Sequence, residues 1–223
     1  MIRLTKRPTP NRLTENAKGW TEAIASKINA GIAPTKLELS RYRHPDIKAE
    51  LIIETSGKCA YCESKLLHIH HGDVEHIYPK SLDPLKAFEW ENLTLACEIC
   101  NQNKSNKDPL AECIIDPYHD DPEEHFLFVG ELIATRGTAK GIATREILAL
   151  QRVALIEVRR EHLEKLLLIV DRILDGGLPI IVRRALYQDF LDKECNSSAA
   201  YSAMARAVIR SLLNEIDPRV VAP

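Results

Sequence analysis

Four paired cysteines are the residues whose spacing most clearly indicates chemistry. Cys59 and Cys62 form one CxxC pair, and Cys97 and Cys100 form a second. Two such turns place four thiolates where they can bind one tetrahedral zinc ion. A site closed by four thiolates has no open position for a substrate, so the spacing predicts a structural zinc ion rather than a Lewis acid.

A small set of polar residues lies within and just after the segment that the cysteine pairs enclose. His76 can accept a proton from water near neutral pH. Glu75 offers a hard oxygen ligand and Asn101 a neutral one, and this small ligand set suits Mg2+, which keeps several waters. Asn92 is better placed to fix a loop or to orient His76 than to do chemistry.

Three lysines lie near this polar set in the sequence. Lys80, Lys104 and Lys107 could each hold a phosphate group of a nucleic acid. The alternative is that these side chains form a solvated face with no ligand.

Two strands and a helix must position the polar residues. Alternation predicts a strand over Asp73–Ile77 and a second over Asn92–Ala96, and a short polar helix is expected from Cys97 to about Asn106. The result is a β-β-α frame held by metal at its ends. His68, His70 and His71 invite a further metal assignment, but neighbouring strand residues face opposite sides and cannot all bind one ion.

The rest of the chain is expected to be mostly helical, which makes the fold class α+β. Residues 1–19, with their prolines and arginines, suggest an irregular basic arm that is either solvated or in contact with nucleic acid or a partner. The other expected elements are helices over Thr21–Ala30, Pro45–Thr55, Thr144–Asp175, Pro179–Cys195 and Ser197–Asp217, and a strand over Phe126–Ala134. The expected domains are N-terminal helices (1–56), the metal-bearing core (57–110) and a C-terminal helical bundle (111–223).

Composition restricts the function and the compartment. The 223 residues carry a formal net charge of −2, so a strongly basic, free-standing DNA binder is excluded and any grip on nucleic acid must be local or come from a partner. The chain shows no secretory signal and no membrane span, and its thiols are paired. These features predict a cytoplasmic protein that binds metal rather than one that forms disulfides.

The segments GDVEHIYPKS and NLTLACEICNQNKS resemble the signature of the HNH, or ββα-metal, endonucleases in their four-cysteine form. The resemblance implies that His76 is the general base, that Glu75 and Asn101 bind a catalytic Mg2+ or Mn2+, and that Asn92 orients the site. The family usually has aspartate where this chain has Glu75. Asp73 is therefore the alternative carboxylate ligand.

A wider resemblance covers IRLTKRP, RYRHPDIKAELIIETSGKCAYCE and IIDPYHDDPEEH, which are similar to the PtuB nucleases of Septu-type anti-phage systems and related retron modules. It implies an effector nuclease that works beside PtuA, an ABC/SMC-like ATPase. DNA is the expected substrate, with RNA, including tRNA, as the alternative. A non-catalytic zinc-stapled binding or adaptor module is the rival hypothesis, but it leaves Glu75, His76 and Asn101 unexplained. The pattern of two CxxC pairs excludes a thioredoxin-like redox protein.

Overall fold

The structure, a computed structural model, describes residues 1–66 and 72–221, so the histidine group at 68–71 lies outside the described residues. In these ranges the helices are α1 (Asn11–Asn29), α2 (Lys36–Leu39), α3 (Pro45–Glu54), α4 (Glu98–Lys104), α5 (Ala139–Ile147), α6 (Val153–Leu174), α7 (Ile180–Lys193), α8 (Ser202–Ser211) and α9 (Pro218–Val221). The strands are β1 (Asp73–His76), β2 (Leu93–Ala96), β3 (Phe126–Val129) and β4 (Leu132–Thr135). Short 3₁₀ turns are η1 (Arg41–Arg43), η2 (Pro84–Phe88), η3 (Trp90–Asn92) and η4 (Pro122–Glu124).

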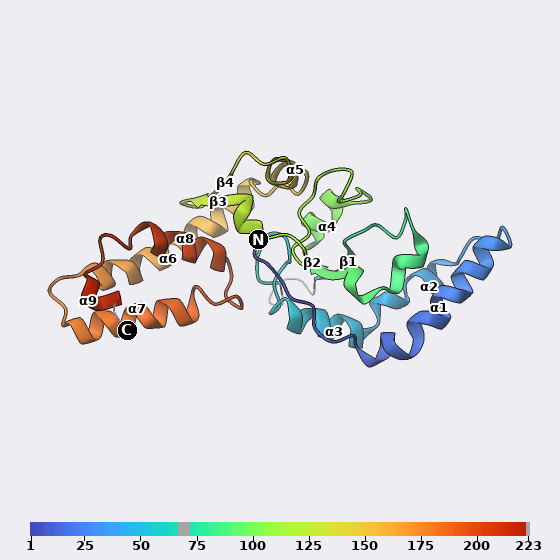
Figure 1. Ribbon diagram of the computed structural model, residues 1–223, viewed down its shortest axis with the longest axis horizontal. Helices are drawn as coiled ribbons and strands as arrows, with labels where there is room; N and C mark the ends of the chain where they lie inside the picture. The colour runs from blue at the N-terminus through green and yellow to red at the C-terminus, as the bar shows by residue number, and fades with distance from the viewer. Residues whose placement is uncertain (67–71, 222–223) are drawn as a thin grey trace.

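The molecule is elongated (Figure 1). Helices α1 to α4 lie with β1 and β2 in one half, α6 to α9 fill the other half, and the β3–β4 hairpin and α5 lie between them. This arrangement confirms the predicted α+β class, with helices before and after a β-β-α unit.

The β-β-α unit is the frame of the candidate site. Strand β1 pairs antiparallel with β2, with Asp73 opposite Ala96 and His76 opposite Leu93. All four residues of β2 are buried, as its apolar sequence requires, and α4 follows directly. Among the described residues β1 pairs with β2 alone, and all four residues of β1 line the cavity described below.

The N-terminal arm packs against the core and helix α1 begins at Asn11, so the irregular, solvated arm expected over residues 1–19 was wrong, while its contact with nucleic acid or a partner stays a prediction. The Leu4 backbone N–H donates to the Pro117 carbonyl at 2.8 Å. The Lys6 ammonium lies 4.1 Å from the centre of the Trp90 ring and 4.5 Å from that of Tyr118, and it pairs with Glu54 at 3.1 Å. Local sequence patterns cannot predict contacts between residues this far apart in the chain. They explain why polar residues near the N-terminus are ordered.

Helix α1 begins ten residues earlier than the sequence predicted. Pro10 precedes its first turn, and Leu13 and Ile24 bury its inner face. Gly19 lies inside the helix, where one glycine costs about 1 kcal/mol of helix propensity. The burial of Leu13 before it and of Ile24 after it outweighs that cost.

Three of the predicted elements in the C-terminal half need correction. The strand expected over Phe126–Ala134 is a hairpin, because Gly130 has a φ of +61° and turns the chain between β3 and β4. The helix expected over Thr144–Asp175 is two helices, α5 and α6, separated by a turn in which Ala149 has a φ of +46°. The helix expected over Ser197–Asp217 is the shorter α8 followed by α9, since Tyr201 takes a left-handed conformation just before α8.

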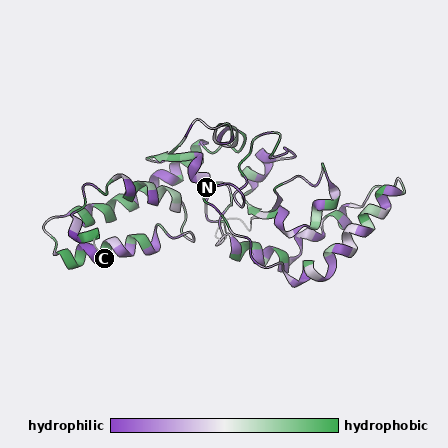
Figure 2. Ribbon diagram, viewed as in Figure 1, coloured by the Kyte–Doolittle hydropathy of each residue, from purple (hydrophilic) through white to green (hydrophobic). Residues whose placement is uncertain are grey.

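One hydrophobic cluster contains buried residues from each of the ranges 1–56, 57–110 and 111–223. The two halves of the molecule therefore share a core. In Figure 2 the long helices carry both hydrophobic and hydrophilic residues, as expected when one face packs and the other meets water. Among the described residues, no helix combines the length and the apolar character needed to cross a membrane.

Candidate active site and metal centre

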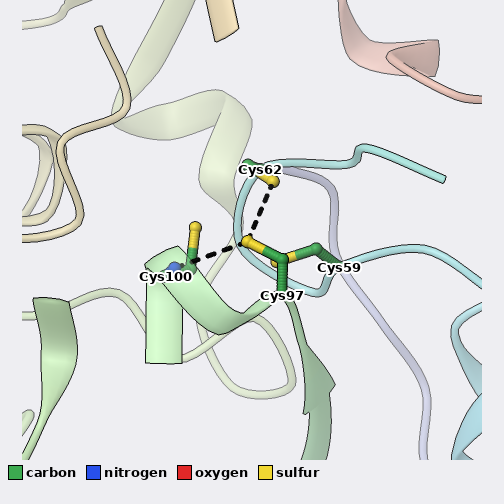
Figure 3. A group of neighbouring side chains, drawn as sticks. All are labelled: Cys59, Cys62, Cys97 and Cys100. Carbon is green, nitrogen blue, oxygen red and sulfur yellow. Dashed lines mark hydrogen bonds between the residues drawn. The ribbon is translucent and has the colours of Figure 1, made fainter. Parts of the chain in front are cut away.

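The four paired cysteines meet between two turns. Cys59 and Cys62 lie in the turn after α3, Cys97 caps the N-terminus of α4, and Cys100 lies in the first turn of that helix. Their sulfur atoms all lie within 4.8 Å of one another, and those of Cys62 and Cys97 are 3.9 Å apart (Figure 3).

The spacing of these sulfurs fits zinc. Four thiolates about 2.3 Å from a tetrahedral ion are separated by about 3.8 Å, close to the distance between Cys62 and Cys97. The four-cysteine cluster therefore suggests zinc binding, as the sequence predicted. Because each pair comes from a different segment, such an ion would tie the turn after α3 to the start of α4.

A cavity of about 410 Å³ opens beside β1. Residues on both faces of a strand can reach a space at its edge, so four consecutive strand residues contribute to the walls. The lining residues are Tyr42, Arg43, Lys48, Gly72, Asp73, Val74, Glu75, His76, Lys80 and Asn101. The structure thus brings His76, Glu75, Asn101 and Lys80 of the predicted site to one cavity.

The imidazole of His76 is buried and held in one orientation. Its Nε2 lies 3.1 Å from the Ala87 carbonyl oxygen, and its ring meets the Tyr42 ring edge-on, 4.4 Å between centres. A carbonyl oxygen can only accept a hydrogen bond, so Nε2 carries the hydrogen in the neutral ring and Nδ1 is the basic nitrogen. Burial lowers the pKa of His76 to about 4, and the positive charges of Lys80, Lys104 and Arg43 act in the same direction.

Because of this depressed pKa, the free energy of unfolding should fall as the pH falls. The pKa of His76 is about 4 in the folded chain against an ordinary 6.5, so between these values only the unfolded chain binds the proton. The stabilising effect is full above pH 6.5 and should decline by about 3 kcal/mol as the pH falls to 4. Urea unfolding of wild type and His76→Gln at several pH values measures it. Parallel pH curves for the two proteins would contradict the assignment.

Glu75 and Lys104 form a buried ion pair. The Lys104 ammonium lies 2.8 Å from Glu75 Oε1 and donates to the His76 carbonyl oxygen, also at 2.8 Å. Burial raises the pKa of Glu75 above its ordinary value, and the lysine charge opposes that rise. Lys104 is fully buried, so its predicted contact with a phosphate needs correction: its charge is directed at Glu75 instead.

Lys104→Met should destabilise the protein strongly, because it leaves the Glu75 carboxylate buried without a counter-charge. Removing one partner of a buried pair costs about 3–5 kcal/mol. The double variant Lys104→Met/Glu75→Gln should recover part of that loss, since no buried charge then remains. Denaturant unfolding of wild type, single and double variants measures both steps, and a single-variant loss below about 1 kcal/mol would contradict the pairing.

Asp73 and Asn101 complete the oxygen-bearing wall of the cavity. The Asn101 side-chain amide donates to Asp73 Oδ2 at 3.0 Å, so α4 and β1 are joined here. With Glu75, two carboxylates and one amide line the same space, which is the donor set that hard divalent cations prefer. The residues fit a catalytic ion, and both carboxylates remain candidates to hold it.

Comparison with known proteins agrees with this geometry. Residues 59–107 match the family model of the HNH endonucleases. The chain carries an HNH endonuclease domain. Two Septu PtuB proteins are similar to it: that of Bacillus mycoides (strain KBAB4) is 26% identical over 270 residues, 96% of this chain and 92% of the relative. That of Bacillus thuringiensis is 29% identical over 154 residues, which cover 69% of this chain and 56% of the relative.

Asn92 fixes the loop of the HNH domain that supports His76. Its side-chain oxygen accepts from the Tyr78 N–H at 2.7 Å, and its amide donates to the carbonyl oxygens of Tyr78 and Lys86 at 3.0 and 3.2 Å. The next carbonyl, that of Ala87, contacts the His76 ring. Asn92 does not line the cavity, so its geometry fits a positioning residue and not a group that touches substrate.

The remaining lysines of the HNH domain differ in their placement. Lys80 lines the cavity, with its ammonium 5.0 Å from the centre of the Tyr42 ring. Lys107 lies outside the cavity and donates to the Asn103 carbonyl oxygen at 3.2 Å. Arg43 and Lys48 also line the cavity. The segment 41–44 predicts either a contact with a base or phosphate or a packed tyrosine between two solvated arginines, and Lys48 was not predicted. That segment precedes α3 and lies outside the HNH match.

Arg152 contacts the cysteine cluster from the start of α6. Its two terminal nitrogens lie 3.8 Å from the sulfur of Cys100 and 3.9 Å from that of Cys97. A zinc ion with four thiolates has a net charge of −2, so a guanidinium there stabilises the loaded centre. The turn that separates α5 from α6 is what brings Arg152 to this position.

Arg152→Gln should weaken zinc binding about tenfold, because the loaded centre loses its nearest counter-charge. Competition with a chromophoric chelator would measure the affinity. Arg152→Lys should retain most of it, and Arg160→Gln, a change in an exposed ion pair on the same helix, is the matched control. Equal zinc affinity for wild type and Arg152→Gln would contradict this role.

Proposed function

We propose that the chain is a metal-dependent endonuclease that hydrolyses phosphodiester bonds of nucleic acid in the cavity beside β1. The observation that supports this most is the buried, neutral imidazole of His76, held by the Ala87 carbonyl. It lines the same cavity as the oxygen donors of Glu75 and Asn101.

In this proposal, His76 Nδ1 accepts a proton from a water molecule as the water oxygen attacks phosphorus. The bond from phosphorus to the leaving 3′ oxygen breaks, and that oxygen takes a proton from solvent. Lys80 and Arg43, at the wall of the cavity, hold the phosphate during the attack. Because the pKa of His76 lies near 4, the base is unprotonated at neutral pH before each turnover.

Glu75 and Asn101 would hold a catalytic Mg2+ or Mn2+, with Asp73 as the alternative carboxylate. A bound divalent ion supplies charge stabilisation to the phosphate oxygens and the leaving oxygen. Lys104 favours the ionised form of Glu75, which is the form that binds metal. The zinc centre would hold the turn after α3 and the start of α4 at a fixed separation without entering the chemistry.

The similarity to Septu PtuB proteins supports a role in anti-phage defence, beside an ATPase of the PtuA type in the cytoplasm. DNA is the proposed substrate, with RNA, including tRNA, as the alternative. The net charge of −2 fits a nuclease that depends on a partner for part of its grip on nucleic acid.

The test is cleavage of plasmid DNA and of cellular RNA by the purified chain, with and without the co-expressed ATPase. Magnesium should be omitted and restored at constant zinc, because a chelator such as EDTA would also remove the structural ion. We expect products only when Mg2+ or Mn2+ is present. Binding without products under every condition would favour the non-catalytic adaptor instead.

A further inference from the structure

A second hollow, the Trp20 groove, adjoins the cavity of the HNH domain. Its volume is about 440 Å³, and Arg43 lines both spaces, so the two are neighbours. The residues that line it are Arg12, Trp20, Leu37, Ser40, Arg41, Arg43 and His44. All of them precede the HNH match at 59–107, so the groove is built by α1, the α2–α3 connection and the end of α2.

Two arginines of the groove lie beside the same aromatic ring. The guanidinium carbons of Arg12 and Arg41 are 5.6 and 5.7 Å from the centre of the Trp20 ring. The ring is half-buried and packs edge-on against the buried Phe88, 5.2 Å between centres, which fixes its position. The groove therefore has a rigid aromatic ring at its centre, and two guanidinium groups lie beside that ring.

No carboxylate in the described part of the chain pairs with these cations. Within residues 1–66 and 72–221, no carboxylate lies within 4.0 Å of the charged nitrogens of Arg12, Arg41 or Arg43, and the groove lining contains no aspartate or glutamate. The Nε of Arg12 is also buried without a hydrogen-bond partner. Several exposed arginines elsewhere do pair with carboxylates, for example Arg160 with Glu131 at 3.1 Å. Neighbouring unpaired guanidiniums repel one another, so the groove favours an anion that bridges them.

We propose that the Trp20 groove binds the sugar-phosphate backbone of the nucleic-acid strand next to the bond positioned in the HNH cavity. Arg12 and Arg41 hold phosphates, and Arg43 joins the groove to the cavity. This inference rests on the proposed nuclease function, which places the nucleic-acid strand in the cavity that adjoins the groove. Phosphate contacts carry no base information, so the groove should raise affinity for any sequence.

The double variant Arg12→Gln/Arg41→Gln tests this in a His76→Ala background, where binding is read without cleavage. The probes are fluorescein-labelled oligonucleotides, single-stranded and duplex, titrated by anisotropy at several salt concentrations. We expect affinity to fall about tenfold or more at low salt, and the slope of log affinity against log salt to drop by about 1.5, as loss of two phosphate contacts requires.

Two control variants and two measurements of folding separate a loss of binding from a loss of folding. Arg12→Lys/Arg41→Lys should retain most of the affinity, because the charges remain. Arg172→Gln/Lys193→Gln, which removes two exposed cations of α6 and α7, should leave it unchanged. Melting temperature and zinc content should match wild type in all of them.

The outcome is independent of catalysis. If the wild-type chain never cleaves but the groove variant still loses affinity and salt slope, the groove stands and the nuclease proposal fails. If the groove variant binds both probes as tightly as its His76→Ala parent, or if that parent binds neither probe, the groove proposal is overturned.

Discussion

His76→Ala should lower the rate of phosphodiester cleavage by about 10²–10⁴-fold, the usual contribution of a positioned general base. The ring is fixed by the Ala87 carbonyl and the Tyr42 ring, so its Nδ1 is held at one position. Initial rates on a saturating substrate, with Mg2+ and zinc held constant, would measure the effect.

The control for this result is a histidine outside the cavity. His119 lies on an exposed loop and pairs with Asp116 at 2.9 Å, so His119→Ala should cleave at the wild-type rate. Zinc content and nucleic-acid affinity should be the same in both variants and in wild type. A His76→Ala protein that cuts as fast as wild type would remove His76 from the mechanism.

Cys97→Ser should have the largest effect on stability. Its sulfur both contributes to the metal centre and accepts from the Cys100 N–H at the start of α4. Structural zinc provides about 10–16 kcal/mol of apparent binding free energy in small zinc domains, and that energy is linked to folding. We expect loss of bound zinc and a fall in melting temperature of order 10 °C or more.

Cys195→Ser is the matched control, because Cys195 is a half-buried cysteine far from the cluster along the chain. It should bind zinc as wild type does and melt within about 2 °C of it, as expected for a conservative change away from the centre. Metal analysis of dialysed protein and a thermal scan measure both variants. Retention of one tightly bound zinc per chain by Cys97→Ser would contradict the four-thiolate centre.

The parts of this protein that the sequence predicted well are those encoded by short-range patterns. Two CxxC turns and two alternating segments indicated the cysteine cluster and the β-β-α frame, because ligand spacing and strand period act over a few residues. The placement of Asn101 in the same cavity as the adjacent pair Glu75 and His76 was supported by a family resemblance, since nothing local links Asn101 to that pair.

The parts that failed depend on contacts between distant segments. Lys104 carries the same local signal as any helical lysine, and only the packing of α4 on β1 shows that its ammonium is buried against Glu75. Lys6 was expected in an irregular arm, yet it packs between Trp90 and Tyr118. The break between α5 and α6 lies in an apolar run that continues the helical period, so periodicity could not reveal it.

Helix α4 spans only Glu98–Lys104, and with its cap Cys97 it contributes to both the cysteine cluster and the cavity. Cys97 and Cys100 belong to the sulfur cluster, and Asn101, the very next residue, faces the cavity. Each residue of an α-helix turns the chain by about 100° and advances it by about 1.5 Å. One inserted residue after Cys100 would therefore swing the amide away from Asp73 while leaving all four sulfurs in place. Helix geometry thus sets the distance between the cysteine cluster and the cavity, and the number of residues between Cys100 and Asn101 cannot change.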